Sequence, residues 1–247
     1  MFTEKCYTIP MNIEPALYLI PVTLGETDLV QVLPSANHDI IVNIKHFIVE
    51  NIRSARRFLK KVEKSIDIDE LTFYELNRHT DRKFIGQYLE PLAKGQAVGI
   101  ISEAGCPAIA DPGADVVAIA QTRGFRVVPL VGPSSIILSV MASGFNGQSF
   151  AFNGYLPPDW PGRVKALKKL ENKIYNEDQT QLFIETPYRN AKMIETILAS
   201  LRPQTKLCIA AGITCDQEYI RTKTVVQWKK EKLPDLSKIP CIFLLYK

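Results

Sequence analysis

Short β-type runs alternate with helical patterns along most of the chain, and this alternation constrains the fold more than any other feature. In the first half, the expected strands are Ala16–Ile20, Phe47–Val49, Leu71–Tyr74, Ala97–Ile101 and Arg126–Leu130. Helical patterns lie between the later strands, near residues 52–66, 81–94 and 114–123. Because strand–helix–strand order produces right-handed crossovers between parallel strands, we expect an α/β fold with a mostly parallel, buried sheet.

The second half of the chain continues the pattern but ends differently. The expected strands are Phe150–Asn153, Gln181–Glu185, Lys206–Ala210, Tyr219–Val226 and Cys241–Leu245, with helices near 163–174 and 190–201. No helical pattern separates the last strands, so we expect a mixed sheet here. Pro129, Gly132 and Pro133 interrupt the chain between the two halves. The sequence therefore predicts an N-terminal extension over 1–14, an N-terminal α/β domain over 15–130 and a C-terminal α/β domain over 131–247.

Composition narrows the class of protein. A hydrophobic content of 46% and a charged content of 23% are typical of a globular chain. The five cysteines form no C-x-x-C pair and the three histidines lack ligand spacing, so we expect neither a disulfide framework nor a metal site. No apolar stretch reaches the ~20 residues of a membrane-spanning helix, and none follows the N-terminus as in a signal peptide. We expect a cytoplasmic protein without a membrane segment.

Two loops are candidate ligand sites. The segment Ser102–Gly113 follows a buried strand, precedes a helix and contains two glycines and two prolines. Ligands of open α/β sheets bind at the carboxyl ends of strands, where this loop must lie, although a plain structural turn is equally consistent with its composition. It lacks the glycine patterns of Rossmann and P-loop phosphate sites. In the second loop, Ser134 or Ser135 can cap the apolar helix Ile136–Ala142, or that helix end can hold a carboxylate.

A row of basic residues follows the second strand with helical spacing, and we call it the basic stripe. It consists of Arg53, Arg56, Arg57, Lys60, Lys61 and Lys64. The apolar residues Ile52, Ala55, Leu59, Val62 and Ile66 fall on the opposite face of the same helix. The net charge of only +4 conceals this concentration, which suits a row of phosphates but also suits a solvated helix face.

Further candidates for nucleic-acid binding lie in the second half. Arg163, Lys165, Lys168 and Lys169 form a second basic helix. Trp160 and Tyr188 lie in proline-containing loops and are candidates for stacking on a base, although we favour core packing for Trp160.

The first loop also carries a family resemblance. Val98–Gly113 resembles the I-S-D-A-G-T-P-x-I-S-D-P-G motif of the tetrapyrrole methylase superfamily. Further segments match, in order, the branch of ribosomal RNA small-subunit methyltransferases I, which methylate the 2′-oxygen of a cytidine ribose. These segments are Leu17–Gly25, Val128–Ser135, Ala142–Gly144, Phe152–Pro157 and Ile184–Arg189. The ordered set covers the chain from about Ala16 to its end.

The resemblance implies two α/β domains with S-adenosylmethionine in the cleft between them, and a homodimer. The cofactor contacts that it implies are Glu103, Gly105, Cys106, Pro107, Ser134, Ser135, Glu185, Ala210 and Ala211. A ribose hydroxyl is a weak nucleophile, so a carboxylate within hydrogen-bond reach would help to remove its proton. Glu50, Glu103 and Asp111 are the candidate catalytic acids, and the sequence does not rank them.

The sequence also departs from the family pattern. Glu50-Asn-Ile-Arg53 stands where the branch has E-D-T-R, and Glu103 and Cys106 replace the usual Asp and Thr of the cofactor loop. Our leading hypothesis is an S-adenosylmethionine-dependent methyltransferase that 2′-O-methylates a ribose in structured ribosomal RNA. The candidate substrate-binding residues are Arg53, Arg56, Arg57, Lys60, Lys64, Tyr188 and Arg189. The alternatives are methylation of a tetrapyrrole or another small molecule, and a non-catalytic RNA-binding relative.

Overall fold

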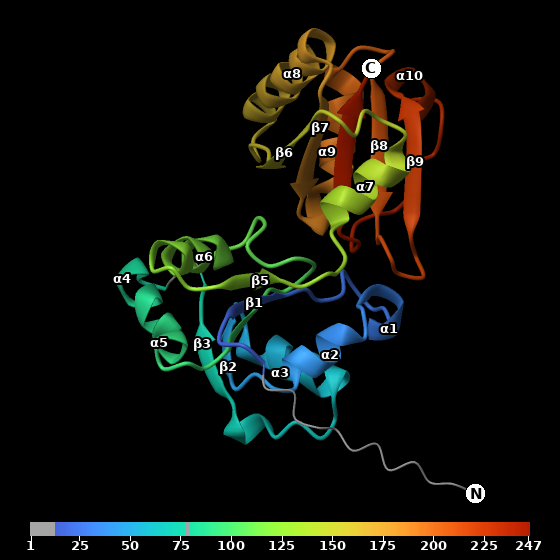
Figure 1. Cartoon of the computed structure of the whole chain (residues 1–247). Coiled ribbons are helices and arrows are strands. Elements are labelled where there is room, and N and C mark those ends of the chain that lie inside the picture. The colour runs from blue at the N-terminus through green and yellow to red at the C-terminus, as the bar shows by residue number, and fades with distance from the viewer. Residues whose placement is uncertain (1–12, 78–79) are drawn as a thin grey trace, which may run out of the picture. The chain divides into compact units, whose positions relative to one another are not determined.

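A computed structural model describes residues 13–77 and 80–247, and the chain forms two compact units (Figure 1). The first unit holds the chain up to Thr23 and Asp28–Pro133. The second holds Leu24–Thr27 and Ser134–Lys247. We placed the division after residue 130, and the compact units divide after Pro133. Most of the predicted N-terminal extension, residues 1–12, lies outside the described residues.

The first unit is built on a parallel sheet of five strands, as the β–α alternation predicts. The strands are β1 (Leu17–Ile20), β2 (His46–Val49), β3 (Thr72–Glu75), β4 (Val98–Ile101) and β5 (Val127–Pro129). Their order is β3-β2-β4-β1-β5, and every pairing is parallel. The carboxyl ends of β2 and β4 are therefore neighbours at one edge of the sheet, with Val49 opposite Ile101.

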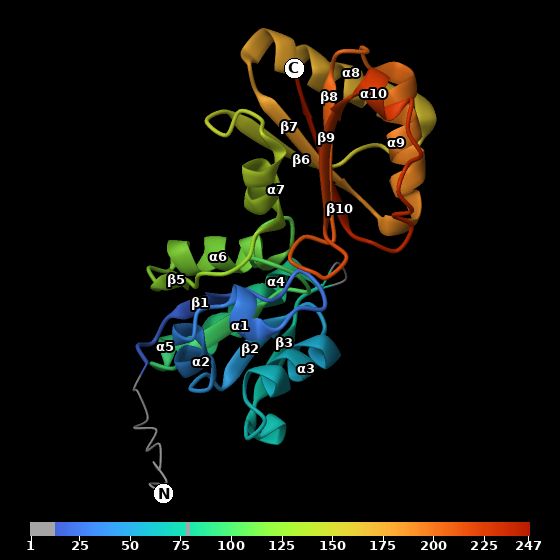
Figure 2. The same cartoon turned by 90° about the vertical axis from the view of Figure 1, so that its right-hand side faces the viewer.

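Helices cover both faces of this sheet (Figure 2). They are α1 (Leu29–Val32), α2 (Ala36–Ile41), α3 (Ile52–Val62), the 3-10 helix η1 (Ile68–Glu70), α4 (Arg82–Ile85), the 3-10 helix η2 (Gly86–Leu89), α5 (Glu90–Ala93) and α6 (Gly113–Thr122). Phe47 packs with Leu59 of α3 on one face, while its neighbour Ile48 packs with Leu89 and Val116 on the other. Successive strand residues point to opposite faces, so both faces are buried.

Some predicted boundaries in the first unit are wrong. The helix expected over 52–66 ends at Val62, because Glu63 adopts an extended conformation and its carboxylate accepts a hydrogen bond from the Ser65 N–H. The helix expected over 81–94 is broken into α4, η2 and α5. Gly86 and Pro91 lie in that stretch, and both residue types weaken a continuous helix.

The second unit contains a mixed sheet, as predicted. Its strands are β6 (Phe150–Tyr155), β7 (Thr180–Glu185), β8 (Lys206–Ala211), β9 (Tyr219–Thr224) and β10 (Cys241–Tyr246). The order is β6-β7-β10-β8-β9, with β6 and β7 parallel and the other pairs antiparallel. The strand expected over 219–226 ends at Thr224, because Thr224 and Gln227 form a capping box that begins a short helix.

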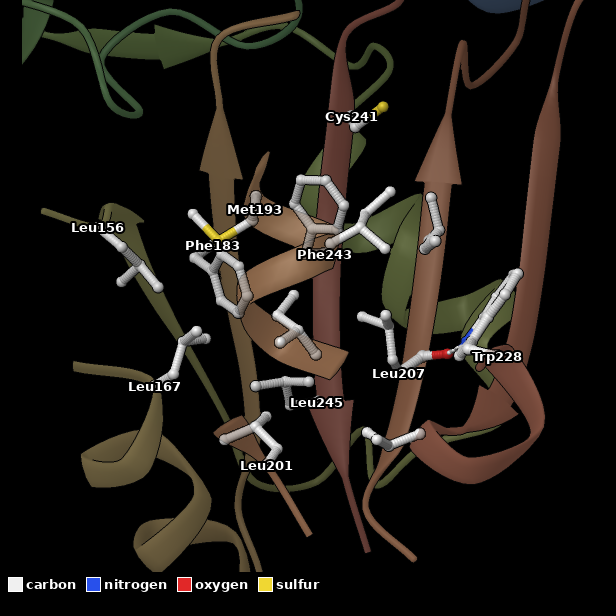
Figure 3. Packing of buried hydrophobic residues seen from close by; sticks show 14 of the residues in the cluster. Leu156, Leu167, Phe183, Met193, Leu201, Leu207, Trp228, Cys241, Phe243 and Leu245 are labelled. Atoms are coloured by element: carbon white, nitrogen blue, oxygen red, sulfur yellow. Dashed lines mark hydrogen bonds between the residues drawn. The ribbon is translucent and has the colours of Figure 1, made fainter. Parts of the chain in front are cut away.

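The helices of the second unit lie on both faces of its sheet. They are α7 (Ser135–Ser143), α8 (Trp160–Glu177), the 3-10 helix η3 (Pro187–Arg189), α9 (Asn190–Ser200) and α10 (Val225–Trp228). Figure 3 shows the core under α8 and α9, where the rings of Phe183 and Phe243 stack with centroids 5.7 Å apart. Trp228 closes one end of this core and donates from Nε1 to the Leu207 carbonyl at 2.9 Å. Within residues 13–77 and 80–247, no helix is long and apolar enough to cross a membrane.

Candidate functional site

The loop between β4 and α6 has a strained backbone of the kind found at ligand-binding sites. Gly105, Ala108 and Ala110 have positive φ angles of 69°, 65° and 62°. The left-handed conformation costs a residue with a Cβ roughly 1–2 kcal/mol, and such strain persists where the surroundings enforce it, commonly at ligand sites. The loop predicted from the Gly/Pro pattern therefore has one specific shape.

Asp111 enforces that shape. Its carboxylate oxygens accept from the Ala108 N–H at 2.9 and 3.0 Å, and Oδ1 also accepts from the Gly113 N–H at 2.6 Å. Burial raises the pKa of Asp111, while the hydrogen bonds from Gly113 and Ala108 oppose that shift. A Cβ at position 113 would lie 2.8 Å from Asp111 Oδ1, so the glycine is required for this close approach.

The beginning of the same loop is held by two other segments of the first unit. The Val22 N–H donates to the Gly105 carbonyl at 3.0 Å. The Cys106 thiol donates to the Pro133 carbonyl at 3.4 Å. Burial raises the pKa of the Cys106 thiol, which favours the neutral donor over a reactive thiolate. A Cβ at Gly132 would lie 2.3 Å from the Pro21 ring, so this turn also packs tightly.

Two of the candidate acids meet at the carboxyl ends of β2 and β4. Glu50 Oε1 accepts from the Glu103 N–H at 3.3 Å, and Ser54 Oγ donates to Glu103 Oε2 at 3.1 Å. Glu103 is exposed and Glu50 is half-buried. Glu50 and Asp111 also line one small cavity among the strand ends, together with Ser102. The structure thus brings all three candidate acids to one edge of the sheet, with Glu50 and Glu103 in direct contact.

The basic stripe begins beside this acid pair. Asn51 caps α3 by accepting from the Ser54 N–H at 3.1 Å, so Glu50 immediately precedes the helix. The members on α3 are all exposed, namely Arg53, Arg56, Arg57, Lys60 and Lys61. Lys64 lies beyond the end of the helix, where its carbonyl accepts from Lys60 Nζ at 2.9 Å. The predicted stripe is confirmed over α3 and is wrong as a continuous helix to residue 66.

The second basic helix differs from its prediction in one residue. Arg163 is buried, and it donates from Nε to Thr196 Oγ1 at 2.9 Å and from Nη1 to the Pro158 carbonyl at 3.1 Å. It is therefore a structural residue of the second unit. Trp160, for which we favoured core packing, is 50% exposed.

The candidate residues of the second unit occupy different environments. Ser134 caps α7 by accepting from the Ile137 N–H at 3.5 Å, and Ser135 is the first residue of that helix. Ala210 and Ala211 are buried in the cores on opposite faces of β8. Their side chains are therefore not available at the surface.

Glu185, the last residue of β7, and the residues that follow it form a charged cluster. Glu185 Oε1 accepts from Arg189 Nε at 2.9 Å and from the Thr186 N–H at 2.7 Å, and this ion pair raises the pKa of Arg189. Glu185 Oε2 is buried without a partner among the described residues. Tyr188 is 71% exposed, and the Arg189 guanidinium carbon lies 5.2 Å from its ring centroid. The cluster therefore presents a stacking ring and an unsatisfied acceptor.

Sequence reasoning missed one residue of similar character. Thr214 follows β8 with a φ of 69°, and its Oγ1 is buried without a partner in the described part of the chain. Its carbonyl accepts from Thr27 Oγ1 at 2.8 Å, a contact within the second unit. In the sequence, Gly212 at the end of a buried strand predicts a turn near Thr214. It does not predict that the Thr214 hydroxyl is buried without a hydrogen-bond partner. Across residues 13–77 and 80–247, no group of His, Cys, Asp and Glu side chains has the arrangement of a metal site.

Known structures share the fold. The chain superposes on the methyltransferase CobJ with a TM-score of 0.62 and 13% identity, covering 94% of each chain. The superposition on uroporphyrin-III-C-methyltransferase from Thermus thermophilus has a TM-score of 0.53 and 15% identity, and it covers 94% of this chain and 93% of that chain. These likenesses confirm the tetrapyrrole methylase fold.

Sequence comparison with curated proteins identifies relatives named ribosomal RNA small subunit methyltransferase I. The protein of Mesorhizobium japonicum is 30% identical over 216 residues, which cover 86% of this chain and 68% of the relative. The protein of Vibrio cholerae is 29% identical over 215 residues, which cover 87% of this chain and 70% of the relative. That of Haemophilus influenzae is 34% identical over 167 residues, covering 67% of this chain and 57% of the relative. No family model matches the sequence. On these relationships and the shared fold, the chain belongs to the ribosomal RNA small subunit methyltransferase I family of methyltransferases.

Proposed function

We propose that this protein transfers a methyl group from S-adenosylmethionine to a ribose 2′-hydroxyl of structured small-subunit ribosomal RNA. The observation that carries the proposal is that the Glu50 carboxylate accepts from the Glu103 backbone N–H, which places both acids at the start of the basic stripe. This arrangement puts a proton acceptor beside a surface that suits phosphates. The names of the relatives support small-subunit ribosomal RNA as the substrate.

The residues present fit the methyl donor. In the first unit, Glu103, Gly105, Cys106 and Pro107 lie at the beginning of a loop whose strained backbone is fixed by Asp111. Such a preformed loop lowers the entropy cost of binding. When bound, S-adenosylmethionine supplies a methyl group on a positively charged sulfur.

In the second unit, the proposed donor contacts are Ser134, Ser135, Glu185, Ala210 and Ala211. Glu185 Oε2 is a buried acceptor without a partner in the described residues, which suits an amino or hydroxyl group of the donor. Because the side chains of Ala210 and Ala211 lie in the cores, we assign any contact there to their backbone.

Glu103 is the proposed proton acceptor. A new O–CH₃ bond forms as the S–CH₃ bond breaks, and the hydroxyl proton passes to a Glu103 carboxylate oxygen. Ser54 Oγ and Glu50 Oε1 hold Glu103 by its side chain and its backbone N–H, respectively. Asp111 uses both oxygens on backbone N–H groups, so we assign it the positioning of the loop.

The substrate contacts that we propose are the basic stripe and the Tyr188–Arg189 pair. Arg53 and Arg57 are exposed on α3 close to the acid pair in sequence, so they are placed to contact phosphates that flank the target ribose. Tyr188 offers an exposed ring for a base. A homodimer and a cytoplasmic location are further parts of this proposal, and light scattering after gel filtration tests the dimer.

The test is methylation of small ribosomal subunits from a methylation-deficient strain with labelled S-adenosylmethionine. We expect label in the RNA at a linkage that resists alkali, because a methylated 2′-oxygen cannot attack its phosphate. Glu103→Gln should lower turnover by roughly 10²–10⁴-fold, whereas the exposed control Glu90→Gln should not. Calorimetry with S-adenosylhomocysteine shows whether either variant has lost cofactor binding instead.

A tetrapyrrole substrate is the second candidate, favoured by the structural likeness to CobJ and to the Thermus thermophilus enzyme. Label that enters a porphyrinoid pool and not the RNA would establish this candidate and refute the first. Absence of S-adenosylhomocysteine binding would instead support the non-catalytic RNA-binding relative.

A further inference from the structure

The exposed face of α8 in the second unit combines lysines with a half-exposed tryptophan. An open groove of about 660 Å³ runs along this face, and its lining includes Trp160, Val164, Lys165, Lys168, Lys169 and Asn172. These positions recur at helical spacing, so they share one side of the helix. We call this lining the α8 groove.

The charge of the α8 groove is uncompensated. Lys165, Lys168 and Lys169 are exposed, and none of them forms an ion pair with any residue of the described chain. Lys165 and Lys169 are four residues apart, a spacing at which like charges destabilise a helix. Glu171, on the same helix, is buried and accepts from Thr205 Oγ1 at 2.6 Å, so it does not neutralise the groove.

The aromatic end of the groove is rigidly supported. The Arg163 guanidinium carbon lies 6.0 Å from the Trp160 ring centroid, which is within cation–π range. Arg163 is itself fixed by hydrogen bonds to Thr196 and the Pro158 carbonyl. Half of the Trp160 surface remains exposed. A held, exposed ring next to a row of lysines is the combination that binds bases and phosphates of a single strand.

We propose that the α8 groove binds an unpaired segment of the RNA substrate, with a base stacked on Trp160 and phosphates on Lys165, Lys168 and Lys169. This assignment rests on the proposed RNA substrate and adds a contact surface on the second unit, whereas the basic stripe and the acid pair belong to the first unit. The same lysines would also attract an acidic peptide. However, Asp and Glu side chains have no ring that could stack on the exposed indole of Trp160.

The experiment measures binding of a fluorescein-labelled uridine 12-mer to the full chain across a salt series. The triple variant Lys165→Gln, Lys168→Gln and Lys169→Gln should reduce the salt slope by about 2 and weaken binding on the order of 100-fold at 0.1 M salt, if each lysine contacts a phosphate. The matched control neutralises three exposed lysines of the same unit, Lys229, Lys230 and Lys232. Equal losses in the two triple variants would overturn the proposal, because only net charge would then matter.

Tryptophan emission gives a second readout. Trp228 is 1% exposed, so quenching by the oligonucleotide reports Trp160. We expect quenching in the wild type and none in Trp160→Phe. Trp160→Phe should retain affinity, whereas Trp160→Ala should lose roughly 5- to 150-fold in affinity. Displacement of the RNA by polyglutamate at equal charge concentration would assign the groove to acidic proteins instead.

These outcomes are independent of the methylation test. If the α8 variants bind the 12-mer like the wild type while Arg53→Gln with Arg57→Gln weakens binding, the α8 assignment is wrong and the proposed function stands. If the α8 variants lose RNA binding but ribosomal subunits are never methylated, the groove stands and the proposed function is wrong.

Discussion

Removal of the Asp111 carboxylate should weaken cofactor binding far more than it weakens the fold. In the wild type, this carboxylate accepts hydrogen bonds from the N–H groups of Ala108 and Gly113. Two hydrogen bonds to a charged group contribute about 3–6 kcal/mol, at roughly 1.5–3 kcal/mol each. The left-handed Ala108 and Ala110 together cost about 2–4 kcal/mol. The bonds therefore slightly outweigh the strain, and the loop keeps its shape.

In Asp111→Ala the strain is no longer opposed. The binding-competent loop then lies about 2–4 kcal/mol above relaxed loops, so its population falls roughly 30- to 900-fold, and the apparent affinity for S-adenosylhomocysteine falls by the same factor. Unfolding should change less, because relaxation of the loop recovers the strain. Calorimetry measures the first effect and urea denaturation the second.

Two further variants make this prediction decisive. Asp111→Asn keeps one acceptor oxygen and should show an intermediate loss. Asp115→Asn should bind like the wild type, because Asp115 lies in the first turn of α6 and pairs with Arg82 instead of with the loop. Wild-type affinity in Asp111→Ala would refute the positioning role. If Asp111→Asn keeps full affinity but loses turnover, Asp111 is the proton acceptor and our assignment of Glu103 is wrong.

Three other perturbations test the fold. Gly132→Ala should destabilise the protein by about 1–3 kcal/mol, because the added Cβ would overlap the Pro21 ring. Gly147→Ala is the control, since a Cβ there would lie 3.6 Å from its nearest neighbour. Equal urea midpoints for the two variants would contradict this prediction. Burial raises the pKa of Cys241 to about 12, so the stability that the neutral thiol contributes is lost as pH rises from 9 toward 12. Between pH 8 and 10.5 this loss is about 2 kcal/mol, and Cys241→Ser should lack it; an identical pH dependence in both proteins would argue against a buried neutral thiol. Thr224→Ala should cost about 0.5–2 kcal/mol by removing the cap of α10, and an unchanged thermal midpoint would refute that role.

Most strands were predictable because they are short runs rich in β-branched, aromatic or other apolar residues with clear ends, although β3, β6 and β9 are not buried. Each of the ten expected strands overlaps an observed one, from Leu17–Ile20 to Cys241–Tyr246. The helices α1 and α2 were not predicted, since they span four and six residues and neither Asp28 nor Ser35 caps its helix through a side-chain hydrogen bond. Short helices without caps leave no periodic signal in a sequence.

The site was predictable in its parts and not in its contacts. The sequence identified Glu50 and Glu103 as candidates, but the two residues are 53 positions apart, and only the strand order places β2 next to β4. Arg163 could not be distinguished from the neighbouring lysines, because its burial depends on Thr196 of another helix. Ionic patterns along one helix show which face is charged, but not which residue is drawn inward by a distant partner.

The four residues Leu24–Thr27 have a consequence for the order in which the chain can fold. Leu24 packs against the sheet face that carries Leu182, and Thr27 bonds the carbonyl of Thr214, 187 residues later in the sequence. During synthesis this segment emerges long before any of its partners exist, so the first unit can finish its sheet while the second waits for its own last strands. A C-terminal fragment that begins at Ser134 would therefore lack part of its native packing, and adding a Leu24–Thr27 peptide would be the way to complete it.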